Sequence, residues 1–163
     1  MVNSASLTDP VLVASAFREA TAEGSYAFHE HLRPEPANEE RDYLIHKDGQ
    51  TYAGAHLLVD YWGATRLNDP ALMEQALREA AESAGATVLH VHVHEFGGGG
   101  GVSGVAVLAE SHISVHTWPE LDYAAFDVFM CGNCSPDRAE QVLKRYFSPE
   151  RSDISEQKRG IVE

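Results

Sequence analysis

Runs of residues with the period of β-strands dominate the chain from Ala53 onward. Residues 56–62 are mainly apolar and are followed by a glycine, which predicts a strand. Apolar and polar residues alternate over most of 87–96, which predicts a second strand. Five consecutive glycines then predict a loop at 97–101, and three further strands are predicted at 103–109, 111–117 and 124–130.

Two other stretches have the period of an amphipathic helix. The first starts with Asp69 as its N-cap and Pro70 in its first turn and ends at Gly85; its predicted buried face is Leu72, Met73, Ala76, Leu77, Ala80 and Ala81. The second starts at Ser135 and Pro136, with predicted inward residues Ala139, Val142, Leu143 and Tyr146. This order of elements predicts an α/β (α+β) fold, a two-layer sandwich of a mainly antiparallel sheet with helices on one face.

The two ends of the chain carry weaker patterns. Residues 10–23 predict a short helix, and residues 26–50 are polar and charged, which predicts a linker or an ordered loop. The residues from Ser148 onward predict a loose, charged tail. We therefore expect an N-terminal extension, one compact domain and a tail, at 1–52, 53–147 and 148–163.

Composition and charge narrow the function classes. The 163 residues are 44% hydrophobic and 23% charged, which is typical of one globular domain. The net charge of -13 argues against a nucleic-acid partner, because phosphate contacts need clustered Lys and Arg. The sequence has no apolar run of membrane-spanning length and no secretory signal at its start, and its two cysteines are too few for a disulfide framework. Together these features predict a cytoplasmic protein without a membrane partner.

Residues with reactive side chains are concentrated in 109–120 and 125–132, where hydroxyls, imidazoles and a thiol occur together. A nucleophile beside a histidine is the usual requirement for acyl chemistry. Each of these residue types is also common in protein cores and at strand ends, so their presence alone predicts no reaction.

This segment resembles the signature of the prokaryotic S-adenosylmethionine decarboxylase proenzymes, which make their own pyruvoyl cofactor by self-cleavage. The resemblance covers 53–147. It rests most strongly on the string 110–120, with further matches at 56–60, 84–87, 101–104, 127–129, Cys131 and Gly132.

The resemblance implies a role for each matching residue. The Ser111 hydroxyl attacks the Glu110 carbonyl, elimination from the resulting ester leaves a dehydroalanine, and its hydrolysis leaves a pyruvoyl group at the new N-terminus. Ser103 and His116 match the family's processing residues, with His116 as the base. The pyruvoyl group then forms a Schiff base with the amine of the substrate, and Cys131 is the implied proton donor after loss of CO₂.

The same resemblance implies the substrate and the assembly. Phe96 and Trp118 match the aromatic pair that stacks on adenine, and Glu120 matches the carboxylate that binds the ribose hydroxyls. The implied activity is a carboxy-lyase that converts S-adenosylmethionine to S-adenosylmethioninamine and CO₂ for spermidine biosynthesis. The implied assembly is a homodimer with an αββα arrangement, in which the two sheets pack face to face.

Three departures from the family pattern keep other functions open. The glycines at 97–100 replace a Ser-Pro-Gln-like stretch beside the substrate pocket, so ornithine or arginine is the alternative substrate. His90, His92 and His94 alternate along one predicted strand, and a metal-binding, non-catalytic protein is the alternative of another class. A further cysteine, Cys134, completes a Cys-x-x-Cys motif, for which a redox or metal role is a further alternative.

Overall fold

The computed structural model describes residues 43–162, so the helix predicted at 10–23 lies outside the described residues. These residues belong to one compact unit, Asp42–Glu163. Its strands are β1 (Ile45–Lys47), β2 (Gln50–Trp62), β3 (Val88–Glu95), β4 (Val102–Leu108), β5 (His112–Trp118), β6 (Tyr123–Met130) and β7 (Arg151–Val162). The helices are α2 (Pro70–Ser83), α3 (Pro136–Phe147) and the short 3-10 helix η1 (Pro119–Leu121). Among the described residues, no helix has the length and apolar character to span a membrane.

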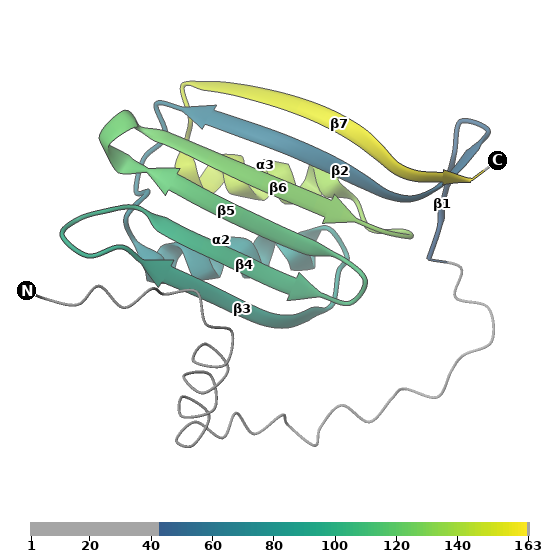
Figure 1. Cartoon of the computed structure of the whole chain (residues 1–163), viewed down its shortest axis with the longest axis horizontal. Coiled ribbons are helices and arrows are strands. Elements are labelled where there is room, and N and C mark those ends of the chain that lie inside the picture. The colour runs from purple at the N-terminus through teal and green to yellow at the C-terminus, as the bar shows by residue number, and fades with distance from the viewer. Residues whose placement is uncertain (1–42, 163) are drawn as a thin grey trace, which may run out of the picture. The chain divides into compact units, whose positions relative to one another are not determined.

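All seven strands form one sheet in which every pairing is antiparallel. The order is β1-β2-β6-β5-β4-β3, and β7 also pairs with β2. As Figure 1 shows, β7 and β3 form the two long edges, and α2 and α3 both lie behind the sheet. The predicted mainly antiparallel sheet with helices on one face is confirmed.

The core lies between this sheet and the two helices. Asp69 caps α2, because its Oδ1 accepts a hydrogen bond from the Leu72 N–H over 3.0 Å, and Gly85 follows the helix with a φ of 86°. Five of the six residues predicted to face inward are fully buried: Met73, Ala76, Leu77, Ala80 and Ala81. From the sheet, alternate residues such as Ile113, Val115 and Val128 complete the core.

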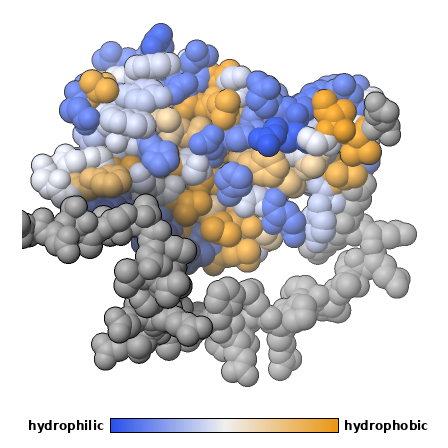
Figure 2. All heavy atoms as spheres, in the orientation of Figure 1, coloured by the Kyte–Doolittle hydropathy of each residue, from blue (hydrophilic) through white to orange (hydrophobic). Residues whose placement is uncertain are grey.

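The opposite face of the sheet is open among the described residues. Because side chains alternate between the faces of a strand, the residues next to the buried ones point to this side. Leu58, Val107 and Trp118 lie here with 40%, 42% and 39% of their surface exposed. Figure 2 shows this face, on which hydrophobic residues lie among hydrophilic ones.

The prediction of a loose tail after Ser148 is wrong. The tail forms β7, which pairs with β2 from Arg151 opposite Trp62 to Val162 opposite Thr51. Nearly every side chain of β7 is exposed, so the strand has no apolar alternation to reveal it. Main-chain pairing with the outer edge of β2 holds β7 in place instead. In addition, the Arg151 guanidinium lies 3.6 Å from the centre of the Trp62 ring.

The predicted linker also needs correction at its end. Residues 45–47 form β1, and β2 starts at Gln50, three residues before the predicted start of the compact domain. The β1–β2 hairpin turns at Asp48 and Gly49, which have φ values of 52° and 74°. Such a turn is local and mostly polar, so hydrophobic periodicity does not detect it.

Candidate active site

The Ser111 centre, which we define as Glu110, Ser111 and Cys131, lies where β4 turns into β5. The Leu108 N–H donates to the Ser111 carbonyl over 3.0 Å and closes a tight hairpin around Ala109 and Glu110. Ser111 is only 7% exposed, and its Oγ accepts a hydrogen bond from the Cys131 N–H over 3.1 Å. This contact connects the start of β5 with the end of β6.

The backbone of Glu110 is strained. Its φ is 59°, a left-handed conformation that residues with a Cβ rarely adopt. The peptide bond that follows Glu110 is the one predicted to be cleaved. The structure thus places the predicted cleavage bond in a tight, strained turn beside a buried hydroxyl.

The two thiols near this centre are half-buried. Burial raises the pKa of Cys131, although the hydrogen bond with Ser111 acts in the opposite direction, and the nearby Cys134 and Glu110 raise it further. Burial also raises the pKa of Cys134, and Glu110 adds to that increase. Both thiols are therefore protonated at neutral pH, the form that a proton donor needs.

A second group of predicted residues lines a pocket of about 360 Å³, which we call the glycine-loop pocket. Its lining includes Phe96, Gly101, Ser103, His116, Trp118 and Glu120. Ser103 and His116 are directly opposite each other on β4 and β5, and Ser103 Oγ lies 2.8 Å from His116 Nδ1. That contact fixes the imidazole ring of His116 through its Nδ1 atom, so its other nitrogen, Nε2, is the one that can transfer a proton.

The glycine loop is built closely against the base of this pocket. A Cβ on Gly101 would lie 2.0 Å from the Thr117 carbonyl oxygen, and a Cβ on Gly100 would lie 2.6 Å from the Phe96 carbonyl oxygen. The Thr117 hydroxyl is 2.8 Å from both the Val102 nitrogen and the Leu67 carbonyl oxygen, and it holds the end of the loop. Only glycine fits at the two positions where the loop approaches the backbone.

Aromatic rings border the pocket with their surfaces accessible. Phe96 is 52% exposed and packs edge-on against His94, with ring centres 5.0 Å apart. Trp118 lies 5.3 Å from Tyr123 between ring centres. Exposed rings of this kind, next to a carboxylate such as Glu120, suit a flat ligand that carries hydroxyl or cationic groups.

The structure does not bring the two groups of predicted residues together within one chain. Ser111 and His116 are five positions apart on an extended strand. At about 3.3 Å per residue, their backbones are separated by roughly 16 Å. The Ser111 centre and the glycine-loop pocket therefore lie toward opposite ends of β5.

The histidine row on β3 does not form a metal site in the structure. The rings of His90 and His92 stack with centres 6.5 Å apart, while His94 packs on Phe96. Within residues 43–162, no three His, Cys, Asp or Glu side chains are grouped so that they could hold a metal ion.

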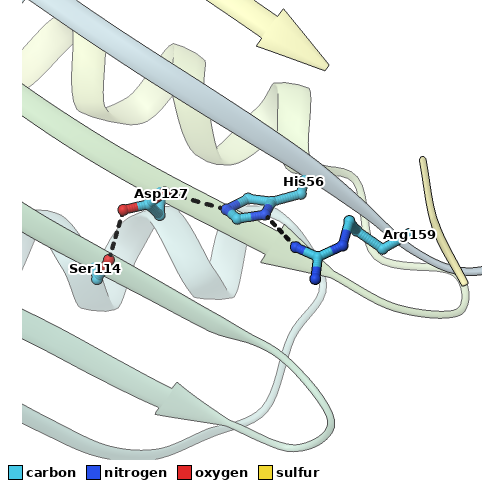
Figure 3. Close-up of polar contacts among 4 residues, drawn as sticks. All are labelled: His56, Ser114, Asp127 and Arg159. Carbon is cyan, nitrogen blue, oxygen red and sulfur yellow. Dashed lines mark hydrogen bonds and ion pairs between the residues drawn. The ribbon is translucent and has the colours of Figure 1, made fainter. Parts of the chain in front are cut away.

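Sequence reasoning missed a polar network on the open face, drawn in Figure 3. Asp127 accepts from the Ser114 hydroxyl over 3.1 Å and lies 3.2 Å from His56 Nε2. Arg159 Nη1 lies 3.4 Å from His56 Nδ1, and since a guanidinium only donates, His56 presents its Nε2–H to Asp127. Only the register of four neighbouring strands reveals this set.

His112, the residue after Ser111, lies beside this network. Its ring stacks on Phe129 with centres 5.3 Å apart and lies 6.3 Å from the His56 ring. Burial lowers the pKa of His112, and the neighbouring His56 lowers it further, while Asp127 raises it. His112 is therefore neutral at neutral pH.

Comparisons with known proteins show the family to which the chain belongs. The family model for S-adenosylmethionine decarboxylase matches residues 55–160. The S-adenosylmethionine decarboxylase proenzyme of Thermomicrobium roseum is 41% identical over 67% of this chain and 95% of its own length. That of Methanococcus maripaludis (strain C7) is 44% identical over 68% of this chain and 92% of its own length.

The crystal structure of the adenosylmethionine decarboxylase from Aquifex aeolicus VF5 superposes with a TM-score of 0.62 at 34% identity, covering 69% of this chain and 94% of that one. The chain belongs to the S-adenosylmethionine decarboxylase family.

Proposed function

We propose that the chain is a self-cleaving, pyruvoyl-dependent decarboxylase. Its substrate in this proposal is S-adenosylmethionine, and its products are S-adenosylmethioninamine and CO₂, which would supply the aminopropyl donor for spermidine biosynthesis. The names of its relatives support the substrate. The observation that carries the proposal is the position of Ser111, a buried hydroxyl directly after a strained residue in a tight turn.

In the proposed cleavage, Ser111 Oγ forms a bond to the Glu110 carbonyl carbon. The amide bond between the two residues then breaks, and an ester joins them. A base removes the Ser111 Cα proton. The backbone carboxylate of Glu110 then leaves as the new C-terminus and takes the ester oxygen with it. Hydrolysis of the remaining unsaturated residue gives the pyruvoyl group and ammonia. The products are the chains 1–110 and 111–163.

The residues around Ser111 fit such a group. A pyruvoyl group in this position would supply an electron-accepting carbonyl for the loss of CO₂ from an amino acid. Before cleavage, the Cys131 N–H donates to Ser111 Oγ, which places Cys131 beside the residue that would become the pyruvoyl group. Because the Cys131 thiol is protonated at neutral pH, we assign it the return of a proton to the substrate carbon.

The glycine-loop pocket fits the other end of the substrate. Phe96 and Trp118 offer exposed rings for stacking on adenine, and the Glu120 carboxylate can accept hydrogen bonds from ribose hydroxyls. Ornithine and arginine lack a flat base and would leave these rings without a partner. This chemistry favours S-adenosylmethionine over the alternative substrates.

The distance between the two groups leads us to propose a homodimer. His116 is roughly 16 Å along β5 from Ser111, too far to take its proton within one chain. If two copies pack their open faces together around a two-fold axis, the Ser111 centre of one copy meets the glycine-loop pocket of the other. Exposed apolar residues on that face, such as Leu58 and Val107, would be covered in the resulting αββα arrangement.

Mass spectrometry of the denatured protein, combined with an activity assay, tests the proposal. We expect two fragments separated after Glu110, the smaller with a blocked N-terminus, and CO₂ release from S-adenosylmethionine but not from ornithine or arginine. Ser111→Ala should remain one chain, because it has no hydroxyl to attack the Glu110 carbonyl. An intact wild-type chain that is active would contradict the mechanism, and preferential turnover of ornithine or arginine would contradict the substrate.

A further inference from the structure

The segment between β6 and α3 holds both cysteines in one β-turn. The Cys134 N–H donates to the Cys131 carbonyl oxygen over 3.3 Å. Gly132 has a φ of 57°, and its N–H donates to the Tyr43 carbonyl oxygen over 2.9 Å, which fixes the first peptide of the turn. A β-turn brings the Cα atoms of its first and fourth residues within about 7 Å. Disulfides span Cα separations of about 4.4–6.8 Å, so the turn already has a suitable geometry.

The surroundings of the two thiols also favour a bond between them. Both thiols are free of disulfide bonds and half-buried. Cys134 packs partly against the core, which limits its movement. Asn133, between them, is exposed, so the turn can adjust on its outer side.

We propose that Cys131 and Cys134 form a reversible disulfide, a redox modification site that switches off the Ser111 centre. The inhibitory part of this inference rests on the proposed function, since it needs Cys131 as a proton donor. The disulfide itself does not depend on that assignment. The co-reactant is a small-molecule disulfide such as oxidised glutathione.

The exchange balances in two steps. The thiolate of one cysteine attacks glutathione disulfide and forms a mixed disulfide, and one glutathione thiol leaves. The second cysteine attacks the protein sulfur of the mixed disulfide and releases the second glutathione thiol. Cys131 and Cys134 together lose two protons and two electrons, and glutathione disulfide gains them.

The surroundings of the two thiols set the rate of this exchange. Burial raises the pKa of both thiols, and the Glu110 carboxylate adds to the increase. Few thiolates are therefore present at neutral pH. We expect the exchange to accelerate by about tenfold per pH unit until the first thiol titrates.

The test uses the full chain incubated with oxidised glutathione, then thiol alkylation and intact mass measurement. We expect the wild type to lose the mass of two hydrogens and both alkylation sites, and dithiothreitol to restore them. Cys134→Ala should stop at the mixed disulfide, with the mass of one glutathione added. Asn133→Ala, a matched change in the same turn, should form the disulfide like the wild type. A wild type that keeps both thiols, or holds only mixed disulfides, overturns the proposal.

Decarboxylation measured on the same samples tests the inhibition. The oxidised wild type should lose at least about nine-tenths of its turnover and recover it with dithiothreitol. Cys134→Ala should be fully active in reductant. If the disulfide forms and turnover is unchanged, the switch is wrong. If the reduced wild type has no decarboxylase activity at all, the proposed function fails, while the disulfide is still judged by mass.

Discussion

Glu110 adopts its left-handed conformation immediately before the bond that we propose is cleaved. Such a conformation costs about 1–3 kcal/mol for a residue with a side chain. The hydrogen bond between Leu108 and Ser111 closes the hairpin that holds it. Cleavage after Glu110 removes the constraint, so part of the conformational strain is released as the reaction proceeds.

At the same scale, Cys131→Ala should separate processing from turnover. Cleavage needs the Ser111 hydroxyl, so the variant should still give two fragments by denaturing mass spectrometry. Its kcat should fall by about 10²- to 10⁴-fold because the proton donor is missing. Since the pKa of Cys131 is raised, wild-type kcat should decline only above the usual thiol range of about 8.5, and that decline should be absent in the variant.

Steady-state CO₂ release across pH checks this prediction. Ser135→Ala, a small change just beyond the Cys131–Cys134 turn, is the control for general disturbance and should keep the wild-type profile. A Cys131→Ala variant with wild-type kcat would mean that water or His116 delivers the proton.

Among the elements, the glycine loop offers a matched pair of substitutions. Gly101→Ala would place its Cβ 2.0 Å from the Thr117 carbonyl oxygen, so the backbone must move. We expect a loss of about 1–3 kcal/mol in the free energy of unfolding, measured with denaturant, and a raised KM. Gly97→Ala meets no atom within 4 Å and should change neither quantity appreciably. Equal effects of the two substitutions would show that the loop is not packed as described.

The elements themselves were largely predictable because their ends carry local signals. Asp69, Pro70 and Gly85 delimit α2, and the alternation of histidine and valine over 90–94 marks β3. β7 was not predicted because its side chains are nearly all exposed and show no apolar alternation. The strand is stabilised by its pairing with β2. The resemblance to a family predicted roles for Ser111, Cys131, Ser103 and His116. It did not predict that Ser111 contacts Cys131 or that Ser103 contacts His116. The network around His56 depends on strand register, which periodicity does not give.

At the scale of the whole molecule, the separation of the Ser111 centre from the glycine-loop pocket makes a complementation experiment decisive. Ser111→Ala and His116→Ala chains should each be inactive alone. When the two are co-expressed, a mixed dimer would contain one complete site, with Ser111 from one chain and His116 from the other. Random pairing should restore about one quarter of wild-type activity. Mass spectrometry should show cleavage only in the His116→Ala chain.

Two outcomes would contradict the shared site. Activity of the His116→Ala chain on its own would show that His116 is not required. A co-expressed mixture as inactive as its components, despite mixed dimers detected by native mass spectrometry, would place the whole site within one chain. Ser103→Ala with Ser111→Ala serves as a parallel pair, because Ser103 lies in the same pocket as His116.

The antiparallel pairing of β7 has a consequence for how the chain behaves among many copies of itself. Without this strand, β2 would present main-chain donors and acceptors along an apolar edge, from Thr51 to Trp62, to any neighbouring molecule. β7 occupies that edge and offers in its place a border that carries Glu156, Lys158 and Arg159. Charged borders of this kind oppose growth of a sheet from one molecule to the next. β7 thus protects the protein from aggregation, although none of its residues belongs to the hydrophobic core.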